Sequence, residues 1–348
     1  MHIPDNYLSA STCAILALAA APAWIHSVKK TTRDFPRERI SAIGVAAAFS
    51  FLAMMFNVPL PGGTTGHAVG GTLLAVLLGP EAACLALTVA LAVQAFVFGD
   101  GGILSFGANC FNMAVVLPFV GYYSYLGLRK LFRASDQFRK RDLLALAIGS
   151  YVGINVSALV AAVEFGLQPL FFHDANGQAL YCPYDLSTSL PAMAIGHLTL
   201  FGLAEVVFTL VVYSFVQKTA PEFFSKGALV ARDSEENAPR SKFTAVYLLL
   251  IALIVATPLG LLADGTAWGE WGADEIAETT VNGEALGYAP SGMTNGFEWN
   301  ALVPDYSTPG LPDWLGYVLS AVGGVAALIV FFKLATLFAT RNGAVADR

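Results

Sequence analysis

The chain has 348 residues, of which 56% are hydrophobic and only 13% are charged, and its formal net charge at pH 7 is −6. A soluble globular domain carries about 25% charged residues, so this composition argues against a soluble enzyme or binding module and indicates a membrane protein. The four cysteines form no CxxC pair, so neither a structural zinc site nor a disulfide framework is indicated.

Nine apolar runs follow one another along the chain, and each predicts a membrane segment, because about 20 apolar residues span a bilayer. The runs cover residues 8–28, 40–56, 68–78, 82–98, 105–128, 143–165, 187–217, 243–262 and 314–338. The third run is too short to span comfortably. No basic region precedes the first run and no cleavage site closes it, so we expect the N-terminus to remain in the mature chain. The sequence therefore predicts an all-α, polytopic membrane protein.

The basic residues gather in only a few of the connections between the apolar runs. All 19 Lys and Arg residues lie in the connections after the first, fifth and seventh segments and in or after the last one. If the short third segment crosses or nearly crosses the membrane, these connections share one side. Positive charge marks the cytoplasmic side. We therefore expect a multi-pass protein of the cytoplasmic membrane, with its N-terminus outside and its C-terminus in the cytoplasm.

The polar connection at residues 218–242 reads as a cytoplasmic linker. It divides a seven-segment part, residues 1–217, from a two-segment accessory part, residues 243–348. The second part contains an external loop, residues 263–313, with nine acidic residues and three tryptophans. Such a loop raises the local concentration of cations. A solvated loop with interfacial tryptophans is the alternative interpretation.

The first two residues, Met1 and His2, form a candidate metal chelate. The Met1 amine, the deprotonated amide nitrogen of His2 and its imidazole Nδ1 close a five- and a six-membered ring around one ion. Three nitrogens held in a plane leave room for a fourth, and a square-planar nitrogen field suits Ni(II) or Cu(II). A histidine at this position is alternatively a simple tail residue.

His67 is the candidate for the fourth nitrogen. It lies in residues 61–71, a stretch with five glycines, which adopt backbone conformations that other residues resist. Irregular backbone at membrane depth is tolerated where it is buried in protein or lines a cavity. We therefore expect His67 to project into the protein from the same side as Met1 and His2.

Other polar residues in the apolar runs are candidates for supporting roles. His197 lies inside the seventh segment with Glu205 two helical turns away, and ionisable groups at that depth are functional candidates. An interhelical hydrogen bond is the alternative for His197. Asn109 and Asn112 share a helical face. With Gln94, they are candidates to satisfy the second nitrogen of a ligating imidazole, or they are polar packing residues.

Several signatures are missing from the sequence. There is no GxxxxGK[ST] phosphate loop, so we expect ATP hydrolysis to reside on separate subunits, and there is no HExxH or GxSxG motif of a protease or hydrolase. No stretch predicts nucleic-acid binding. His26 lies at the basic inner edge and is assigned a structural role, and His173 lies in an external loop where it could meet incoming metal.

Taken together, these motifs resemble the CbiM/NikM substrate-capture subunits of energy-coupling factor transporters for cobalt and nickel. The resemblance covers most of residues 1–217, and its motifs lie at 1–5, 62–67, 78–80, 94–102 and 107–113. It implies that Met1, His2 and His67 bind the metal. Asn6 and Tyr7 stand where the family usually has a glycine and an aromatic residue, which does not affect the chelating atoms.

The C-terminal part is similar to the small two-span partner subunit of these transporters, here fused to the capture subunit. Residues 268–272 and 304–309 carry this looser likeness. The resemblance implies a transmembrane coupling subunit and one or two cytoplasmic ATPases as partners, with membrane lipid around the chain. It further implies that ATP-driven reorientation exposes the bound ion to the cytoplasm.

The sequence thus predicts a capture subunit for Ni²⁺ or Co²⁺ as transported substrate, with no cofactor. Square-planar nitrogen ligation favours Ni(II). Two alternatives stay open: a capture subunit for a vitamin, and a membrane scaffold or intramembrane enzyme. Extending the N-terminus by one residue would separate them, because only the chelate needs a free amine. Metal affinity is expected to fall with falling pH, since every ligand must lose a proton.

Overall fold

The fold is known from a computed structural model that describes residues 1–35, 40–60, 64–133, 139–219, 241–263, 265–281 and 284–346. Most of the linker expected at 218–242, and two glycines of the loop before His67, lie outside the described residues. Within the described ranges most of the chain is helical, with irregular connections and four strands of two or three residues.

The first part of the chain, up to residue 219, consists of helices joined by short connections. Its helices are α1 (Ala10–Asp34), α2 (Ile40–Met54), α3 (Gly71–Leu78), α4 (Pro80–Val93), α5 (Phe106–Asn109), α6 (Leu117–Leu131), α7 (Arg139–Gly166), α8 (Gln168–Phe171), α9 (Leu186–Gly196) and α10 (Gly202–Thr219). Three π-helical segments are continuous with these helices: η2 (Gln94–Phe98), η3 (Cys110–Val116) and η5 (His197–Phe201).

The second part contains two long helices with an irregular external loop between them. Its elements are α12 (Ser241–Ala256), η8 (Thr257–Leu262), η9 (Ile276–Glu278), β3 (Thr280–Val281), β4 (Glu284–Ala285), α13 (Ser291–Thr294), η10 (Pro304–Tyr306) and α14 (Asp313–Ala346). Strands β3 and β4 pair in antiparallel fashion.

Seven helices among the described residues are long and apolar enough to cross a membrane, judged by length and composition. This confirms the predicted all-α, polytopic membrane fold. Two further segments are shorter than a span, α2 with 15 residues and α3 with eight. Only the segment at α3 was expected to be short. The apolar run containing α2 extends to Phe56, but its helix ends at Met54 because the chain turns there into strand β1 (Val58–Leu60).

Local chemistry explains where several helices begin. Ser9 precedes α1, and its side chain accepts a hydrogen bond from the Thr12 amide, which satisfies one free N–H of the first turn. Asp185 caps α9 in the same way through Thr188. Helix α4 begins with a proline directly after Gly79, whose φ of 95° only glycine adopts readily.

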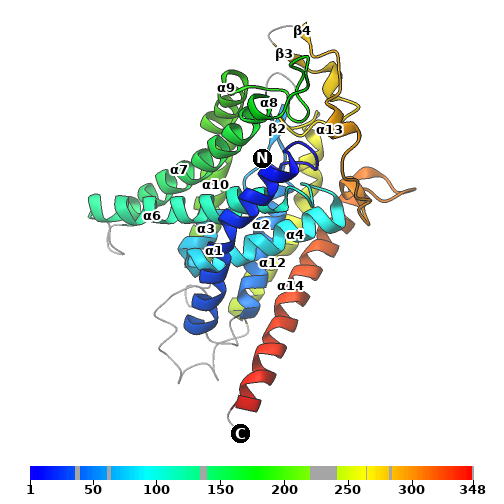
Figure 1. Ribbon diagram of the computed structural model, residues 1–348. Helices are drawn as coiled ribbons and strands as arrows, with labels where there is room; N and C mark the ends of the chain where they lie inside the picture. Colours follow the sequence, from blue (N-terminus) through cyan, green and yellow to red (C-terminus); the bar gives the residue numbers. More distant parts are fainter. Residues whose placement is uncertain are drawn as a thin grey trace.

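The two parts of the chain pack against each other through α2 and α14. A Cβ atom placed on Gly324 of α14 would lie 2.3 Å from the Phe51 ring of α2, and one on Gly44 would lie 3.0 Å from Phe332. These glycines therefore allow the two helices to approach closely. Figure 1 shows α14 running beside α2 and ending at the C-terminus, far from the external loop.

The N-terminus lies inside the molecule. In Figure 1 it sits among the helices, below the external loop that carries β3, β4 and α13. Ile3, Tyr7 and Leu8 have no exposed surface. The first nine residues are therefore an internal segment of the fold.

Candidate metal centre

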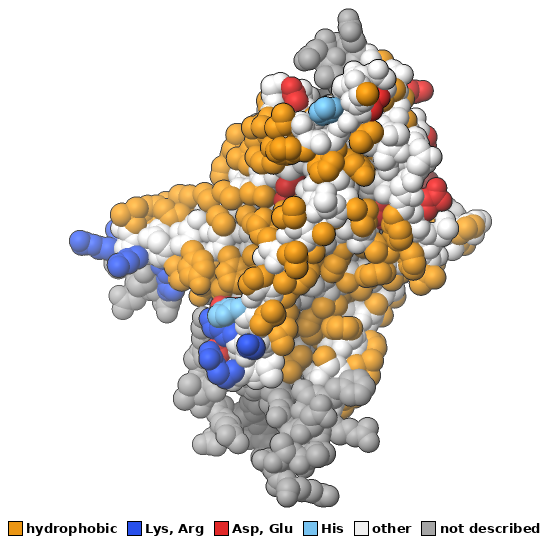
Figure 2. Space-filling view, in the orientation of Figure 1, with side chains coloured by type: hydrophobic (Ala, Val, Ile, Leu, Met, Phe, Trp, Pro, Cys, Tyr) orange, Lys and Arg blue, Asp and Glu red, His pale blue; other side chains and the backbone are white. Residues whose placement is uncertain are grey.

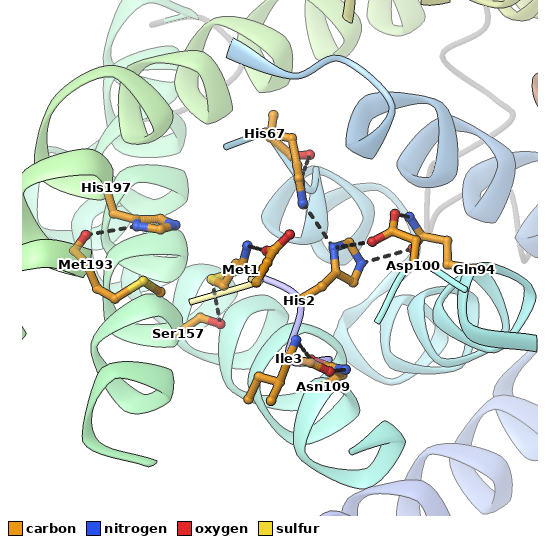
Figure 3. Close-up of polar contacts among 12 residues, drawn as sticks. Met1, His2, Ile3, His67, Gln94, Asp100, Asn109, Ser157, Met193 and His197 are labelled. Carbon is orange, nitrogen blue, oxygen red and sulfur yellow. Dashed lines mark hydrogen bonds and ion pairs between the residues drawn. The ribbon is translucent and has the colours of Figure 1, made fainter. Parts of the chain in front are cut away.

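Backbone hydrogen bonds to side chains fix the N-terminal segment. Asn109 holds Ile3 on both sides: its Oδ1 accepts from the Ile3 amide at 2.7 Å, and its Nδ2 donates to the Ile3 carbonyl at 2.9 Å. The Ser105 hydroxyl donates to the same carbonyl at 2.5 Å. Because Ile3 follows the two proposed chelating residues directly, these contacts fix where Met1 and His2 lie (Figure 3).

The N-terminal segment is also held at Asp5 and at Tyr7. Asp5 accepts hydrogen bonds from the amides of Ile103 and Leu104, at 3.1 and 2.6 Å. The amide of Cys182 donates to the Tyr7 carbonyl at 3.0 Å. Residues 103–109 and Cys182 thus hold residues 3–7, which leaves the first two residues little freedom.

A short hairpin presents His67. Strands β1 and β2 (Thr64–Gly66) pair in antiparallel fashion, with Val58 opposite Gly66, and His67 follows directly. The next residues enter α3, so His67 lies at the corner between the hairpin and the helix. Its side chain is buried, and in Figure 3 it points toward His2. This is the position that the glycine-rich sequence predicted.

The imidazoles of His2 and His67 face each other. His67 Nε2 and His2 Nδ1 are 3.2 Å apart. The other nitrogens face carbonyl oxygens: His67 Nδ1 lies 3.2 Å from the Ala68 carbonyl, and His2 Nε2 lies 3.3 Å from Gln94 Oε1. A carbonyl oxygen only accepts, so the tautomers with the hydrogen on His67 Nδ1 and His2 Nε2 satisfy both contacts. In these tautomers the lone pairs of His67 Nε2 and His2 Nδ1 point at the same space, and His2 Nδ1 also lies 3.3 Å from Asp100 Oδ1.

Neighbouring groups fix the orientation of Gln94. Its Nε2 donates to Asp100 Oδ2 at 3.1 Å and to the Tyr306 hydroxyl at 3.2 Å, which turns its oxygen toward His2. The Tyr306 hydroxyl donates to Asp100 Oδ2 at 2.5 Å. Burial, reinforced by the Asp100 carboxylate, raises the pKa of Tyr306 well above its usual value, so the hydroxyl remains a donor. A chain of hydrogen bonds thus supports the His2 ring.

The Met1 amine forms an ion pair with the external loop. It donates to Glu270 Oε1 at 2.7 Å. The sulfur of Met1 accepts a weak contact from the Ser157 hydroxyl at 3.7 Å. Among the described residues, the amide nitrogen of His2 has no hydrogen-bond partner. The amide that a metal would deprotonate is therefore not engaged elsewhere.

A cavity of about 510 Å³ adjoins this arrangement and is shared by both parts of the chain. Its lining includes His2, His67, Asp100, Glu270 and Asp305. Three carboxylates and two imidazoles therefore border one space. Burial, with the nearby Asp100 carboxylate, raises the pKa of Asp305 above its ordinary value.

His197 lies on the other side of Met1 from His2 (Figure 3). Its Nδ1 donates to the Met193 carbonyl one turn earlier at 2.9 Å, and its ring packs edge-on against Phe201. A small cavity of about 20 Å³ separates it from Met1. His197 thus lies near the candidate centre without a hydrogen bond to either of the two facing imidazoles.

The remaining candidate side chains contact the backbone or another side chain, and neither of them hydrogen-bonds to an imidazole among the described residues. Glu205 accepts from the amides of Val69 and Gly70, at 2.7 and 2.8 Å, and makes no hydrogen bond to His197. Asn112 donates to Glu164 Oε2 at 2.7 Å. Of the three amide side chains expected beside an imidazole, only Gln94 has that contact, because the geometry turns Asn109 to Ile3 and Asn112 to Glu164.

The other two histidines lie away from this centre. His26 is exposed, with Nε2 3.7 Å from Glu81, and His173 is exposed in a loop. Within the described ranges, no group of three His, Cys, Asp or Glu side chains is arranged to hold a metal ion. A metal at the candidate centre would therefore need further ligands beside the two imidazoles, such as the main-chain nitrogens of Met1 and His2.

A model of the family CbiM, described as the cobalt uptake substrate-specific transmembrane region, matches residues 2–223. The chain belongs to the CbiM family. A model of the PDGLE domain matches residues 242–341. The candidate centre is therefore built by the CbiM part and covered by the PDGLE part, which supplies Glu270 and Tyr306.

Relatives of this CbiM protein include chains with the same two parts. The chain is 47% identical to the "Fused nickel transport protein NikMN" of Rhodobacter capsulatus, over 94% of this chain and 95% of the relative. It is 48% identical to the "Probable fused nickel transport protein LarMN" of Lactiplantibacillus plantarum, over 96% and 97% of the two chains. A solved structure described as a truncated transition metal transporter is 50% identical, with a TM-score of 0.59, and covers 63% of this chain and 99% of its own.

Several residues of the centre in this CbiM chain were missed by sequence reasoning. Asp100, Glu270 and Tyr306 each stand inside a motif on which the family resemblance rests, but none was assigned a role. Glu270 and Tyr306 are separated from the N-terminus by most of the chain. Glu270 stands among glycines and tryptophans, and Tyr306 lies in a short stretch bounded by prolines. Such patterns predict a structured loop without indicating what it contacts.

Proposed function

We propose that this chain is the metal-capturing membrane subunit of an importer for Ni²⁺ or Co²⁺. The names of the two fused relatives, both nickel transport proteins, support a nickel substrate. The composition of the candidate centre supports a transition metal, because imidazole and amine nitrogens suit Ni and Cu better than Mg or Ca. The ion is the transported substrate in this proposal and not a resident cofactor.

The observation that carries the proposal is the facing pair of imidazole nitrogens, 3.2 Å apart. When their other nitrogens donate to carbonyl oxygens, His2 Nδ1 and His67 Nε2 both offer lone pairs to the same space, which Asp100 Oδ1 borders at 3.3 Å from His2 Nδ1. Movement of the two rings by a fraction of their separation would give each nitrogen the distance of about 2 Å that metal–imidazole bonds require. The Met1 amine and the His2 amide would complete four nitrogens in a plane.

The protonation state of His67 favours metal binding. Burial of the side chain lowers the pKa of His67 well below its ordinary value of 6.5, and the positive charge of the N-terminus lowers it further. The imidazole is therefore neutral at physiological pH, and no proton has to be displaced from it. The amine and the amide must still lose protons, so affinity falls as the pH falls.

Supporting residues divide into two groups in this proposal. Gln94 orients the His2 ring, and Asn109 fixes the backbone next to it. His197 and Asn112 lie further out, His197 across a small cavity from Met1 and Asn112 in contact with Glu164. Loss of a residue that orients a metal ligand usually lowers affinity by about 10- to 100-fold.

The charge distribution supports an external entrance. On the face shown in Figure 2, basic side chains lie at the far ends of α1 and α6, and acidic side chains gather around the external loop. Because positive charge marks the cytoplasmic side, we place the N-terminus and the cavity outside the cytoplasmic membrane. The carboxylates at the cavity would then attract divalent cations.

Transport requires partners in this proposal. The chain has no phosphate-binding loop of its own, so a transmembrane coupling subunit and cytoplasmic ATPases would supply the energy. Binding of these subunits would reorient the chain and expose the ion to the cytoplasm.

Capture of a vitamin is the second candidate, because the cavity volume of about 510 Å³ lies within the range of small-molecule sites. Metal content and Ni²⁺ and Co²⁺ binding of the purified chain separate the two functions. We expect one tightly bound ion that is lost in His2→Ala and in His67→Ala. Unchanged metal binding in both variants would overturn the metal proposal, and the relative affinities of the wild type would identify the preferred ion.

A further inference from the structure

The loop between His67 and α3 is held from outside the loop itself. Residues 67–70 turn from strand β2 into α3, and Gly70, the residue before the helix, adopts a left-handed φ of 75°. Gly70 has no side chain to satisfy the free amides at the start of the helix, a task that Ser, Thr, Asp or Asn usually performs. The amides of Val69 and Gly70, directly before the helix, are instead held by a group from another helix.

Glu205 of α10 is that group. Its Oε2 accepts from the Val69 amide at 2.7 Å and from the Gly70 amide at 2.8 Å. The side chain has no exposed surface, and Oε1 has no hydrogen-bond partner among the described residues. A carboxyl group buried in a membrane helix is costly. The two short hydrogen bonds are the interactions that offset this cost here.

Helix α10 and the π-helical segment before it also grip the loop on both sides of His67. A Cβ atom on Gly66 would lie 2.6 Å from the Phe201 ring, and a Cβ atom on Gly70 would lie 2.9 Å from the Phe208 ring. The two rings therefore pack directly against these glycines and leave no room for a side chain at either position. The carboxylate and the two rings thus define one position for the backbone around His67.

Among the proposed ligands, His67 alone comes from a distant part of the chain. The Met1 amine and the two nitrogens of His2 are joined by short covalent paths, so their relative positions are nearly fixed. The fourth nitrogen closes the plane only if the loop places it correctly. Groups that orient a ligand through the backbone therefore act directly on metal affinity.

We infer that Glu205 is a positioning residue for His67, which it places opposite His2 by clamping the amides of Val69 and Gly70. The inference rests on the proposed metal-binding function and deepens it. Glu205 itself does not touch the metal. Its effect passes through the main chain of the loop.

The test compares three variants of the full-length protein. Glu205→Leu removes the acceptor, Glu205→Gln retains one acceptor oxygen, and Thr209→Val alters a buried polar residue one turn away on the same helix. Nickel affinity, the visible absorption spectrum of the Ni(II) complex and the melting temperature of the metal-free protein are measured for each. The spectrum reports whether four nitrogens surround the ion, which a purely structural role would not change.

We expect Glu205→Leu to lose about 10- to 100-fold in nickel affinity and to show an altered Ni(II) spectrum. Glu205→Gln should retain the wild-type spectrum with a smaller loss, and Thr209→Val should retain both. A wild-type affinity and spectrum in Glu205→Leu would overturn the inference, whatever happens to its melting temperature. Equal losses in Glu205→Leu and Thr209→Val would overturn it too.

His67→Ala separates this inference from the proposed function. If His67→Ala binds nickel like the wild type, the proposed centre itself is wrong. If His67→Ala loses binding and Glu205→Leu does not, only the positioning role is wrong. In a background that already lacks His67, Glu205→Leu should cause no further loss of the residual affinity, and an additional loss would contradict an action through His67.

Discussion

The amine of Met1 and the carboxylate of Glu270 lie 2.7 Å apart although 269 positions separate them in the chain. This ion pair joins the first residue of the CbiM part to the external loop of the PDGLE part. The loop therefore covers the candidate metal centre and contributes charge to it. The acidic loop that the sequence shows therefore places one of its carboxylates, Glu270, directly beside the N-terminus.

Extending the chain by one residue before Met1 tests the chelate. The added residue converts the amine into an amide, which removes one proposed ligand and the partner of Glu270. The loss of nickel affinity should exceed the ~100-fold upper range for loss of a supporting residue. Binding is measured by competition with a chelator of known affinity. A residue added after the C-terminus is the matched control, and an extended N-terminus that binds nickel normally would contradict the chelate.

Gln94→Ala tests the support of the His2 ring. The variant removes the oxygen that faces His2 Nε2, so the ring loses its fixed orientation, and nickel affinity should fall by about 10- to 100-fold. Isothermal titration of the purified protein measures the change. Asn155→Ala provides a control, because Asn155 is buried but donates within its own helix, to the Tyr151 carbonyl. Equal losses in the two variants would count against a specific role for Gln94.

Glu270→Gln tests the electrostatic role of the external loop. The change removes one of three carboxylates at the cavity, so the association rate of Ni²⁺ should fall by up to about tenfold and become less sensitive to salt. Stopped-flow measurements at several ionic strengths provide the rates. Glu298→Gln is the matched control, since Glu298 lies exposed on the same loop outside this cavity. A comparable effect of both changes would indicate only the net charge of the loop.

The depressed pKa of His67 predicts how the metal-free protein responds to acid. The unfolded chain binds a proton at this residue below about pH 6.5, whereas the buried imidazole does not, so stability is lost as the pH falls through that value. One such group contributes up to about 1.4 kcal/mol per pH unit. His67→Gln should lose less stability than the wild type between neutral and mildly acidic pH. Thermal unfolding of both proteins across that range measures the difference, and identical profiles would show that His67 is not the group responsible.

Much of the fold was predictable because membrane segments are long apolar runs. The segments at α4, α7 and α14 stand out in the sequence without any tertiary information, and the family resemblance was confirmed by the match over residues 2–223. The candidate chelate at Met1 and His2 also rests on a local pattern, and its metal binding stays a prediction. These features depend on neighbours in sequence, which is why the sequence carries them.

The partners of individual polar side chains were less predictable. Asn109 and Asn112 share a helical face, yet one holds the Ile3 backbone and the other contacts Glu164. Helical spacing says which residues share a face but not what packs against it. Glu205 was expected near His197, whereas its partners lie about 135 positions away. Contacts of this kind are decided by how helices pack and cannot be inferred from spacing alone.

The three π-helical turns have a consequence for how such a protein can vary. Each adds one residue to a helical turn, and one residue rotates the following side chains by about 100° around the axis. Gln94 and His197 both lie at the first position of such a turn. At His197 the helix continues into α10, so the extra residue decides which side of α10 the later residues occupy, Glu205 among them. A deletion that restores an ordinary α-helical turn would therefore rotate Glu205 by about 100° relative to the Val69 and Gly70 amides that it now holds.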